Sequence, residues 1–257
     1  LHYRPQSVLL TGVEFDHADI FDNLDQIMAA FDKFLRLVPD TGRILVWSGS
    51  PEAMELARRV KGGPTVEAYG VGDDPVPDDL PFWKGNVLGR ERHGTEVGIR
   101  KQGEKFAWVR TTLTGTYNLR NVVGCVALAH HLGPGPEALA KGVIGFRGVK
   151  RRQQVRGVAM GVTVIDDFAH HPPAVRETLS GLRTAYQGRL FAIFEPRSAT
   201  SRRAVFQQAY AEAFDAADEV VIGPPFDQSR IDEEERLDPE QLVASLRHRD
   251  VRAGYIP

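Results

Sequence analysis

The chain has 257 residues, 42% hydrophobic and 26% charged, which is enough apolar material for one large or two ordinary domains. The formal charge of -2 excludes a global positive field, so we expect neither nucleic acid nor a membrane surface as a partner. A single cysteine and the lack of a long apolar run exclude a disulfide framework and a membrane span, and they indicate a cytoplasmic protein.

The first part of the chain alternates predicted strands and helices. SVLLTGV (7–13) and RILVWSG (43–49) read as buried strands. Between them, apolar residues recur at three- and four-residue spacing, typical of an amphipathic helix, and Asn23 is its predicted N-cap. PEAMELARRV (51–60) predicts a second, short helix.

From Thr65 to Thr116 the pattern changes to short alternating pieces: VEAYGVG, GTEVGIR and KFAWVRTTL. We predict that these pieces form an antiparallel addition to the sheet. The amphipathic helix NLRNVVGCVALAHHLG (118–133) follows, in which Cys125 is expected to be a small buried core residue.

After the basic join GVKRRQQVRG (148–157), strands and helices alternate to the end, beginning with GVTVIDDF. Such alternation predicts a parallel sheet wrapped by helices. We therefore expect an α/β fold with two domains, over residues 1–148 and 149–257.

Polar clusters at the carboxyl ends of parallel strands are the first candidates for a site, because ligands bind there in open α/β sheets. Three clusters qualify: Glu14, Asp16, His17 and Asp19; Asp166, Asp167, His170 and His171; Glu195, Arg197 and Ser198. The first of these clusters combines carboxylates and an imidazole, which suits a magnesium-bound nucleotide, although an Asp-rich capping loop explains it equally well.

In the second cluster, two adjacent aspartates follow an apolar run, and they cannot both point into a core. One of them, Asp166 or Asp167, is expected to accept hydrogen bonds from ribose hydroxyls. Pro172 fits the start of a helix, which leaves His170 and His171 beside its positive end, where phosphate is attracted. A purely structural role for the histidines is the alternative.

Three further features have a functional and a plain interpretation. Arg197 offers a fork that matches carboxylate or phosphate, or it forms a surface ion pair with Glu195. Asn118 and Asn121 read an adenine edge, or one of them caps its helix. The basic join containing Arg151 contacts nucleotide, or it is a solvated linker.

No G-x-x-x-x-G-K-[ST] phosphate loop occurs in these 257 residues, and YGVGDD reads as a turn.

Several of these segments resemble the Mur ligase family, which joins amino acids or peptides to UDP-N-acetylmuramate using ATP. HYRPQSVLLTGVEFDHADIF is similar to its strand and D-H-x-D loop, and GTYNLRNVVGCVALA to its H-N-x-x-N helix start, with Tyr117 replacing the usual histidine. FRGVKRRQQVRG resembles the hinge into its C-terminal domain, and DDFAHHP its ribose and substrate loop. The resemblance implies the remainder of a central ATP-binding domain followed by a Rossmann-like C-terminal α/β domain.

The resemblance also implies ATP and Mg²⁺ as cofactors, with His17 binding the metal, two asparagines contacting adenine and an aspartate contacting ribose. The candidate catalytic residues are His17, His170 and Arg197, and the candidate nucleotide-binding residues are Asn118, Asn121, Arg151 and Asp167.

The implied reaction is an ADP-forming ligation through an acyl phosphate on the muramyl carboxylate, which the amine of the second substrate then attacks. DHADIF and EPRSAT resemble the loops of one branch of the family, and this resemblance implies the tripeptide L-Ala-γ-D-Glu-meso-diaminopimelate as that substrate. L-alanine is the close alternative, and a non-catalytic nucleotide-binding module is the distant one. We expect the chain to be an inactive fragment that lacks the family's uridine-nucleotide domain, its phosphate loop and its last C-terminal strands.

Overall fold

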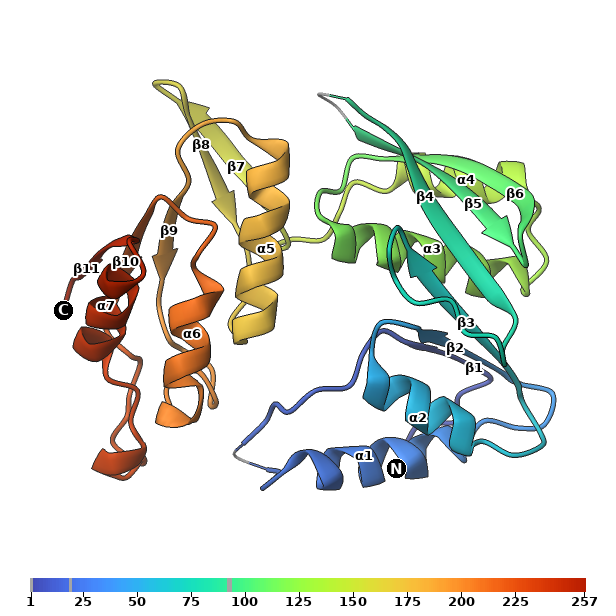
Figure 1. Cartoon of the computed structure of the whole chain (residues 1–257), viewed down its shortest axis with the longest axis horizontal. Coiled ribbons are helices and arrows are strands. Elements are labelled where there is room, and N and C mark those ends of the chain that lie inside the picture. Colours follow the sequence, from blue (N-terminus) through green and yellow to red (C-terminus); the bar gives the residue numbers. More distant parts are fainter. Residues whose placement is uncertain (1, 19, 92–93) are drawn as a thin grey trace. The chain divides into compact units, whose positions relative to one another are not determined.

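The computed structural model describes residues 2–18, 20–91 and 94–257 (Figure 1). Asp19, a member of the first predicted polar cluster, lies outside the described residues. The chain divides into two compact units: Leu1–Phe15 with Phe21–Arg147, and Asp16–Ile20 with Gly148–Pro257. Both units mix helices and strands, so the predicted α/β class is confirmed. No helix in the described part of the chain is long and apolar enough to cross a membrane.

The first unit is built on one mixed sheet with the strand order β1-β2-β3-β4-β5-β6. The first four strands run parallel, and the last two are antiparallel to their neighbours. The strands are β1 (Ser7–Leu10), β2 (Arg43–Trp47), β3 (Thr65–Val71), β4 (Phe82–Glu91), β5 (Gly94–Lys101) and β6 (Glu104–Thr111).

The prediction that VEAYGVG belongs to an antiparallel addition is wrong, because β3 pairs parallel with both β2 and β4. A short apolar run is compatible with either direction, and here the crossover through helix α2 (Pro51–Arg59) sets it. Strand β4 escapes the sequence pattern because glycines and charges interrupt its apolar residues. The antiparallel pairing of β5 and β6 agrees with the prediction.

Helices cover both faces of this sheet, because successive strand residues point to opposite sides. Helices α1 (Leu24–Leu35) and α2 pack on the face that includes Ile44 and Val46. Helices α3 (Thr116–His130) and α4 (Pro136–Gly145) pack on the opposite face, which includes Leu45. The result is a three-layer arrangement, with the helices on either side of the sheet (Figure 1).

Two local predictions have different outcomes. Asn23 caps α1 as predicted, since its side chain accepts the N–H of Gln26 at 3.1 Å. The predicted burial of Cys125 is wrong, because this residue is exposed. Its neighbours on α3, Val123 and Val126, are buried, and position 125 lies outside that apolar stripe.

The second unit contains a three-stranded parallel sheet in the order β11-β10-β9. The buried side chains of these strands pack against α5, α6 and α7 in one hydrophobic core that includes Phe194, Tyr210 and Val220. The elements are β7 (Gln154–Ala159), β8 (Val162–Asp166), α5 (Pro172–Ala185), β9 (Phe191–Phe194), η1 (Ala204–Phe206), α6 (Gln207–Ala213), β10 (Glu219–Ile222), η2 (Glu233–Glu235), α7 (Pro239–His248) and β11 (Arg252–Tyr255).

The prediction that GVTVIDDF begins the parallel sheet is wrong. This segment forms β8, which pairs antiparallel with β7 in a separate two-stranded sheet. Between the two strands, Met160 (φ 47°) and Gly161 (φ 78°) both have left-handed backbones, which is the requirement of a tight hairpin turn. The end of the basic join is therefore a strand, and it takes β8 as its partner.

Candidate functional site

At the carboxyl ends of β2 and β3, three side chains connect the sheet to the first turns of α3. The Asp74 carboxylate accepts the Val71 N–H at 2.8 Å, the Trp47 indole N–H at 3.0 Å and two Arg120 N–H groups at 2.7 and 2.9 Å. The guanidinium of Arg120 also lies 4.3 Å from the centre of the Trp47 ring. Burial acts to raise the pKa of Asp74, but the hydrogen bonds from Arg120, Val71 and Trp47 outweigh it and lower the pKa. Asp74 is therefore a buried, ionised carboxylate.

The two predicted adenine-binding amides lie in the first turns of α3. Gly115, with φ 86°, precedes the helix, and no side chain caps it. The Asn118 side-chain amide donates a hydrogen bond to the Thr114 carbonyl at 2.7 Å, so the interpretation of Asn118 as an N-cap does not hold. This bond orients the amide and leaves its carbonyl oxygen as an acceptor. Asn121 is exposed.

The loop that carries His17 is an exposed turn. His17 has a left-handed backbone (φ 56°), and its N–H donates to the Asp16 carboxylate at 2.7 Å. The His17 carbonyl accepts the N–H of Ile20 at 2.8 Å. The imidazole side chain is 64% exposed, and its Nε2 lies 4.0 Å from Asp16 Oδ2. The ring is accordingly open to a ligand, with a carboxylate beside it.

Asp16 and His17 could hold magnesium only in a binding mode in which water supplies most of the ligands. Within residues 2–18, 20–91 and 94–257, no three His, Cys, Asp or Glu side chains form a group that could hold a metal ion. Mg²⁺ at nucleotide sites is usually held by one or two protein ligands, with water and substrate phosphates completing the octahedron. Asp16 and His17 suit that mode.

In the second unit, Asp167 ties three segments together. Its carboxylate accepts the N–H of Gln153 at 2.7 Å, the N–H of Ala169 at 2.7 Å and the hydroxyl of Thr178 at 3.4 Å. A carboxylate has about four acceptor positions, so these bonds leave roughly one for an outside donor. Asp167 therefore fixes the loop after β8 and keeps about one acceptor position.

Arg151 and His170 both contact the Phe168 ring, in the loop after β8. The Arg151 guanidinium lies 5.0 Å from the Phe168 ring centre and 3.9 Å from an oxygen of Asp166. His170 Nδ1 lies 2.9 Å from the Phe168 carbonyl, which can only accept, so Nδ1 carries a proton in this contact. Helix α5 begins at Pro172, which confirms the predicted position of the histidines beside a helix start.

Arg197 lies on the loop after β9, and the interpretation as a surface ion pair describes its contacts here. Its Nε is 3.6 Å from Glu195 Oε1, and its side chain is 62% exposed. The guanidinium lies 4.8 Å from the ring centre of Phe226, which follows β10. The structure thus brings Arg151, Asp167 and His170 together at one loop and places Arg197 on another.

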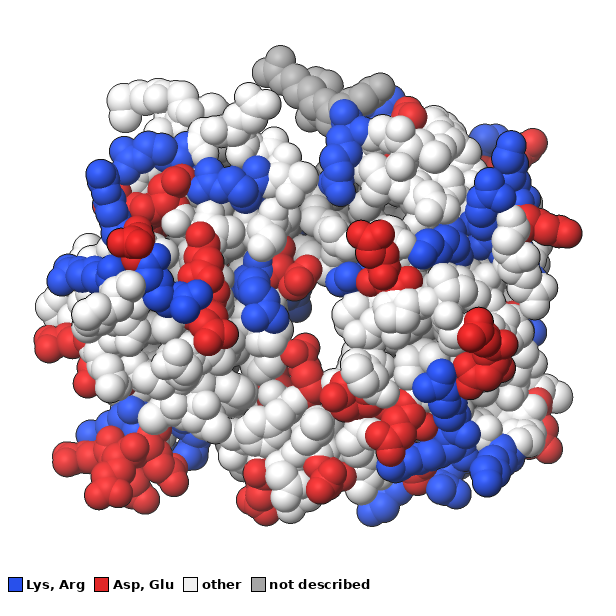
Figure 2. All heavy atoms as spheres, in the orientation of Figure 1, with Lys and Arg blue, Asp and Glu red and all other residues white. Residues whose placement is uncertain are grey.

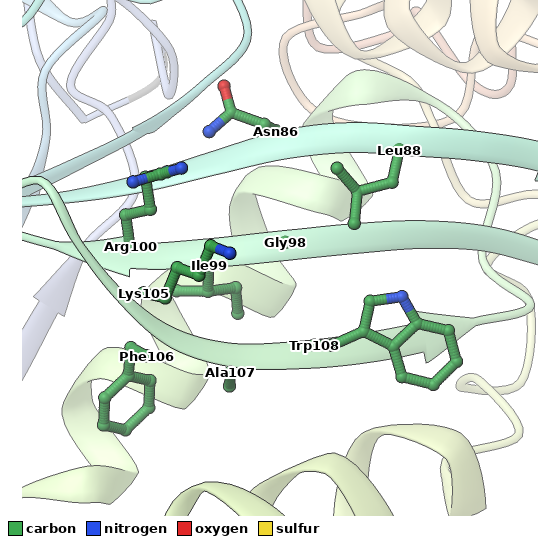
Figure 3. Close-up of a pocket in the computed structure, with 9 residues that line it drawn as sticks. All are labelled: Asn86, Leu88, Gly98, Ile99, Arg100, Lys105, Phe106, Ala107 and Trp108. Atoms are coloured by element: carbon green, nitrogen blue, oxygen red, sulfur yellow. The ribbon is translucent and has the colours of Figure 1, made fainter.

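Neither surface charge nor a cavity distinguishes the candidate residues from the rest of the surface. Figure 2 shows basic and acidic side chains interspersed over the visible face, with acidic side chains concentrated over η2. A cavity of about 550 Å³ lies over the middle of β4, β5 and β6, with Gly98 between Leu88 and Trp108 (Figure 3). Its size suits a small molecule. It contains none of the predicted site residues, so it is not assigned to the ligase reaction.

Trp47, Asp74 and Arg120 escaped the sequence reasoning, although a signal for one of them was present. The Asp73–Asp74 pair follows a predicted strand, as Asp166–Asp167 does, but the glycines of YGVGDD predict only a turn. The turn is real, since the Asp74 N–H donates to the Val71 carbonyl at 3.1 Å. In addition, the Asp74 side chain within this turn links the sheet to α3 through Arg120.

Comparison with known proteins identifies the family. Residues 1–129 match the Mur ligase middle domain, and residues 151–257 match the glutamate ligase domain of Mur ligases. The chain therefore belongs to the Mur ligase family, as the sequence motifs predicted.

Individual relatives show how much of a complete protein is represented. The chain is 36% identical over 227 residues to the UDP-N-acetylmuramate–L-alanyl-γ-D-glutamyl-meso-2,6-diaminoheptandioate ligase of Escherichia coli K12, covering 88% of this chain and 47% of that protein. It is 29% identical over 260 residues to the UDP-N-acetylmuramate–L-alanine ligase of Desulfitobacterium hafniense, covering 100% and 55%. The solved UDP-N-acetylmuramate–alanine ligase of Thermotoga maritima shares the fold, with a TM-score of 0.72 at 20% identity over 99% of this chain and 51% of that one. The chain thus spans about half the length of these relatives.

Proposed function

We propose that this chain is part of an ADP-forming ligase that joins the tripeptide L-Ala-γ-D-Glu-meso-diaminopimelate to UDP-N-acetylmuramate. The observation that carries the proposal is the 36% identity to the Escherichia coli enzyme named for that tripeptide, together with the matches to both family domains. DHADIF and EPRSAT point to the same substrate by their resemblance to that branch of the family. Because relatives named for L-alanine match similarly well, L-alanine is the second candidate.

The described side chains suit distinct tasks in such a reaction. Asn118 and Asn121 supply amide groups for the adenine edge, and Asp167 and Arg151 supply an acceptor and a cation for the rest of the nucleotide. His17 and Asp16 are the proposed protein ligands of Mg²⁺, which when bound neutralises charge on the phosphates.

The remaining candidates, His170 and Arg197, act on the reacting groups in this proposal. His170, whose Nδ1 is bonded to the Phe168 carbonyl, interacts with the reacting groups through its other ring nitrogen, and the exposed fork of Arg197 orients a carboxylate or phosphoryl oxygen. Such a reaction depends mainly on positioning and on stabilising the charge that develops on the acyl phosphate.

The deciding experiment uses the full-length protein that contains this chain, with ATP, Mg²⁺ and UDP-N-acetylmuramate. ADP release and the mass of the product are compared for the tripeptide and for L-alanine. Faster turnover of L-alanine contradicts the tripeptide assignment and leaves the ligase assignment intact. No ADP release with either substrate contradicts the ligase assignment and favours a nucleotide-binding module. The isolated 257 residues are expected to release no ADP, since they contain no phosphate loop.

A further inference from the structure

We infer that Trp47, Asp74 and Arg120, called here the α3 anchor, position Asn118 and Asn121 and so set the affinity of the protein for adenine nucleotides. The inference rests on the proposed ATP-dependent function. In it the three anchor residues are positioning residues, because they act through the asparagines and do not touch the nucleotide.

The first turn of α3 needs such support. The residue that precedes this helix is Gly115, and no side chain forms an N-cap hydrogen bond there. Helix ends open more easily than helix middles, and the first two turns of α3 carry the two amides. Arg120 lies between Asn118 and Asn121 in the sequence, and its bonds to Asp74 hold this turn to the loop after β3.

The anchor also reaches the ends of the neighbouring strands. A Cβ atom at Gly49 would lie 2.4 Å from the Trp47 ring, so glycine is required for the indole to fold over the loop after β2. The same ring lies 3.8 Å from the Cβ position of Gly12, in the loop after β1. The anchor thus connects α3 to the end of β2 and to the loop after β3, at the edge of the sheet where ligands bind.

An arginine is needed at position 120 for geometric reasons. Its fork donates to both oxygens of Asp74 while its flat face covers the Trp47 ring. The side chains of Arg120 and Asp74 are 21% and 7% exposed, so water does not replace these contacts. Lysine supplies a charge at the same place but neither the paired hydrogen bonds nor the planar face.

The test compares R120K and the double variant D74N/R120M with wild type in the full-length protein. R120K keeps a cation beside Asp74, and the double variant leaves no buried charge without its partner. The matched control is R58M, because Arg58 forms the same two-bond contact with Asp79, at 2.8 and 3.0 Å, on the exposed end of α2.

Two readouts are taken: amide hydrogen exchange over residues 116–122, and the dissociation constant of Mg-ATP with the KM of each substrate. R120K and D74N/R120M are expected to accelerate exchange in this segment and to weaken Mg-ATP binding about tenfold, the effect of losing one charged hydrogen bond. The KM of UDP-N-acetylmuramate is expected to stay unchanged, and R58M is expected to leave all readouts unchanged.

Unchanged exchange in both anchor variants would show that the first turn of α3 does not depend on the anchor, and the inference would be wrong. Accelerated exchange with unchanged Mg-ATP affinity would overturn the functional half of the inference. Absence of adenine-nucleotide binding by the wild-type protein is a different failure, since it contradicts the proposed function itself, and the exchange data would still report on the anchoring of the helix.

Discussion

Replacement of Glu67 is expected to destabilise the first unit strongly, because this buried carboxylate has three donors around it. Its side chain is 6% exposed. One oxygen accepts the Trp83 indole N–H at 3.0 Å and pairs with His131 Nε2 at 2.8 Å, and the other lies 3.4 Å from Arg43. Removing one partner of a buried charged network usually costs about 3 to 5 kcal/mol, and we expect this loss for Glu67→Ala.

Glu67→Gln separates the hydrogen bonds from the charge. An amide with its oxygen toward Trp83 and His131 keeps both of those bonds and turns its NH₂ group toward Arg43. Only the contact with Arg43 and the charge assistance are then lost, and we expect about 1 to 2 kcal/mol.

Urea unfolding followed by tryptophan fluorescence measures both variants selectively, since all three tryptophans, Trp47, Trp83 and Trp108, lie in the first unit. The reasoning fails if Glu67→Ala costs less than about 1 kcal/mol, or if it costs no more than Glu67→Gln.

Three further predictions concern the first unit. Burial lowers the pKa of His131 below its ordinary value, so the unfolded chain takes up a proton at higher pH than the folded one, and stability should fall as the pH drops below about 6.5. Urea midpoints measured from pH 8 to 5 should depend less on pH in His131→Gln than in wild type, and equal dependence would contradict this prediction. The pKa of Asp74 is lowered on balance, so its contribution to folding stability is present above the ordinary carboxylate pKa and is lost on acidification below it. The stabilities of wild type and Asp74→Asn should therefore differ in their dependence on acid pH, and superimposable curves would show that Asp74 is not stabilised as a carboxylate. At Gly124 an added Cβ would lie 2.8 Å from Leu9, so Gly124→Ala should cost about 1 to 3 kcal/mol of stability. The control Gly142→Ala in α4, where an added Cβ meets nothing within 4 Å, should be neutral or stabilising, and equal thermal shifts in the two variants would show that α3 does not pack this closely.

Much of the candidate site could be located from the sequence, because the relevant signals are local. A polar cluster after an apolar run marks a strand end, and a proline pair marks a helix start, so the positions of Asp167, His170 and Arg197 beside regular elements follow from neighbouring residues. Their chemical roles stay predictions. The contacts of Asp167 with Gln153 and Thr178 could not be anticipated, because they join separate segments.

The sequence by itself determined the α/β class, the helices with their apolar stripes, the Asn23 cap and the family, since each depends on residue types at short spacing. Strand direction and partner were decided only by the tertiary structure: β3 is parallel and β8 belongs to a hairpin, because pairing depends on the path of the connecting chain. The α3 anchor is decided in the same way. Trp47 and Arg120 meet at Asp74 from 27 and 46 residues away, and no local pattern records a contact across that separation.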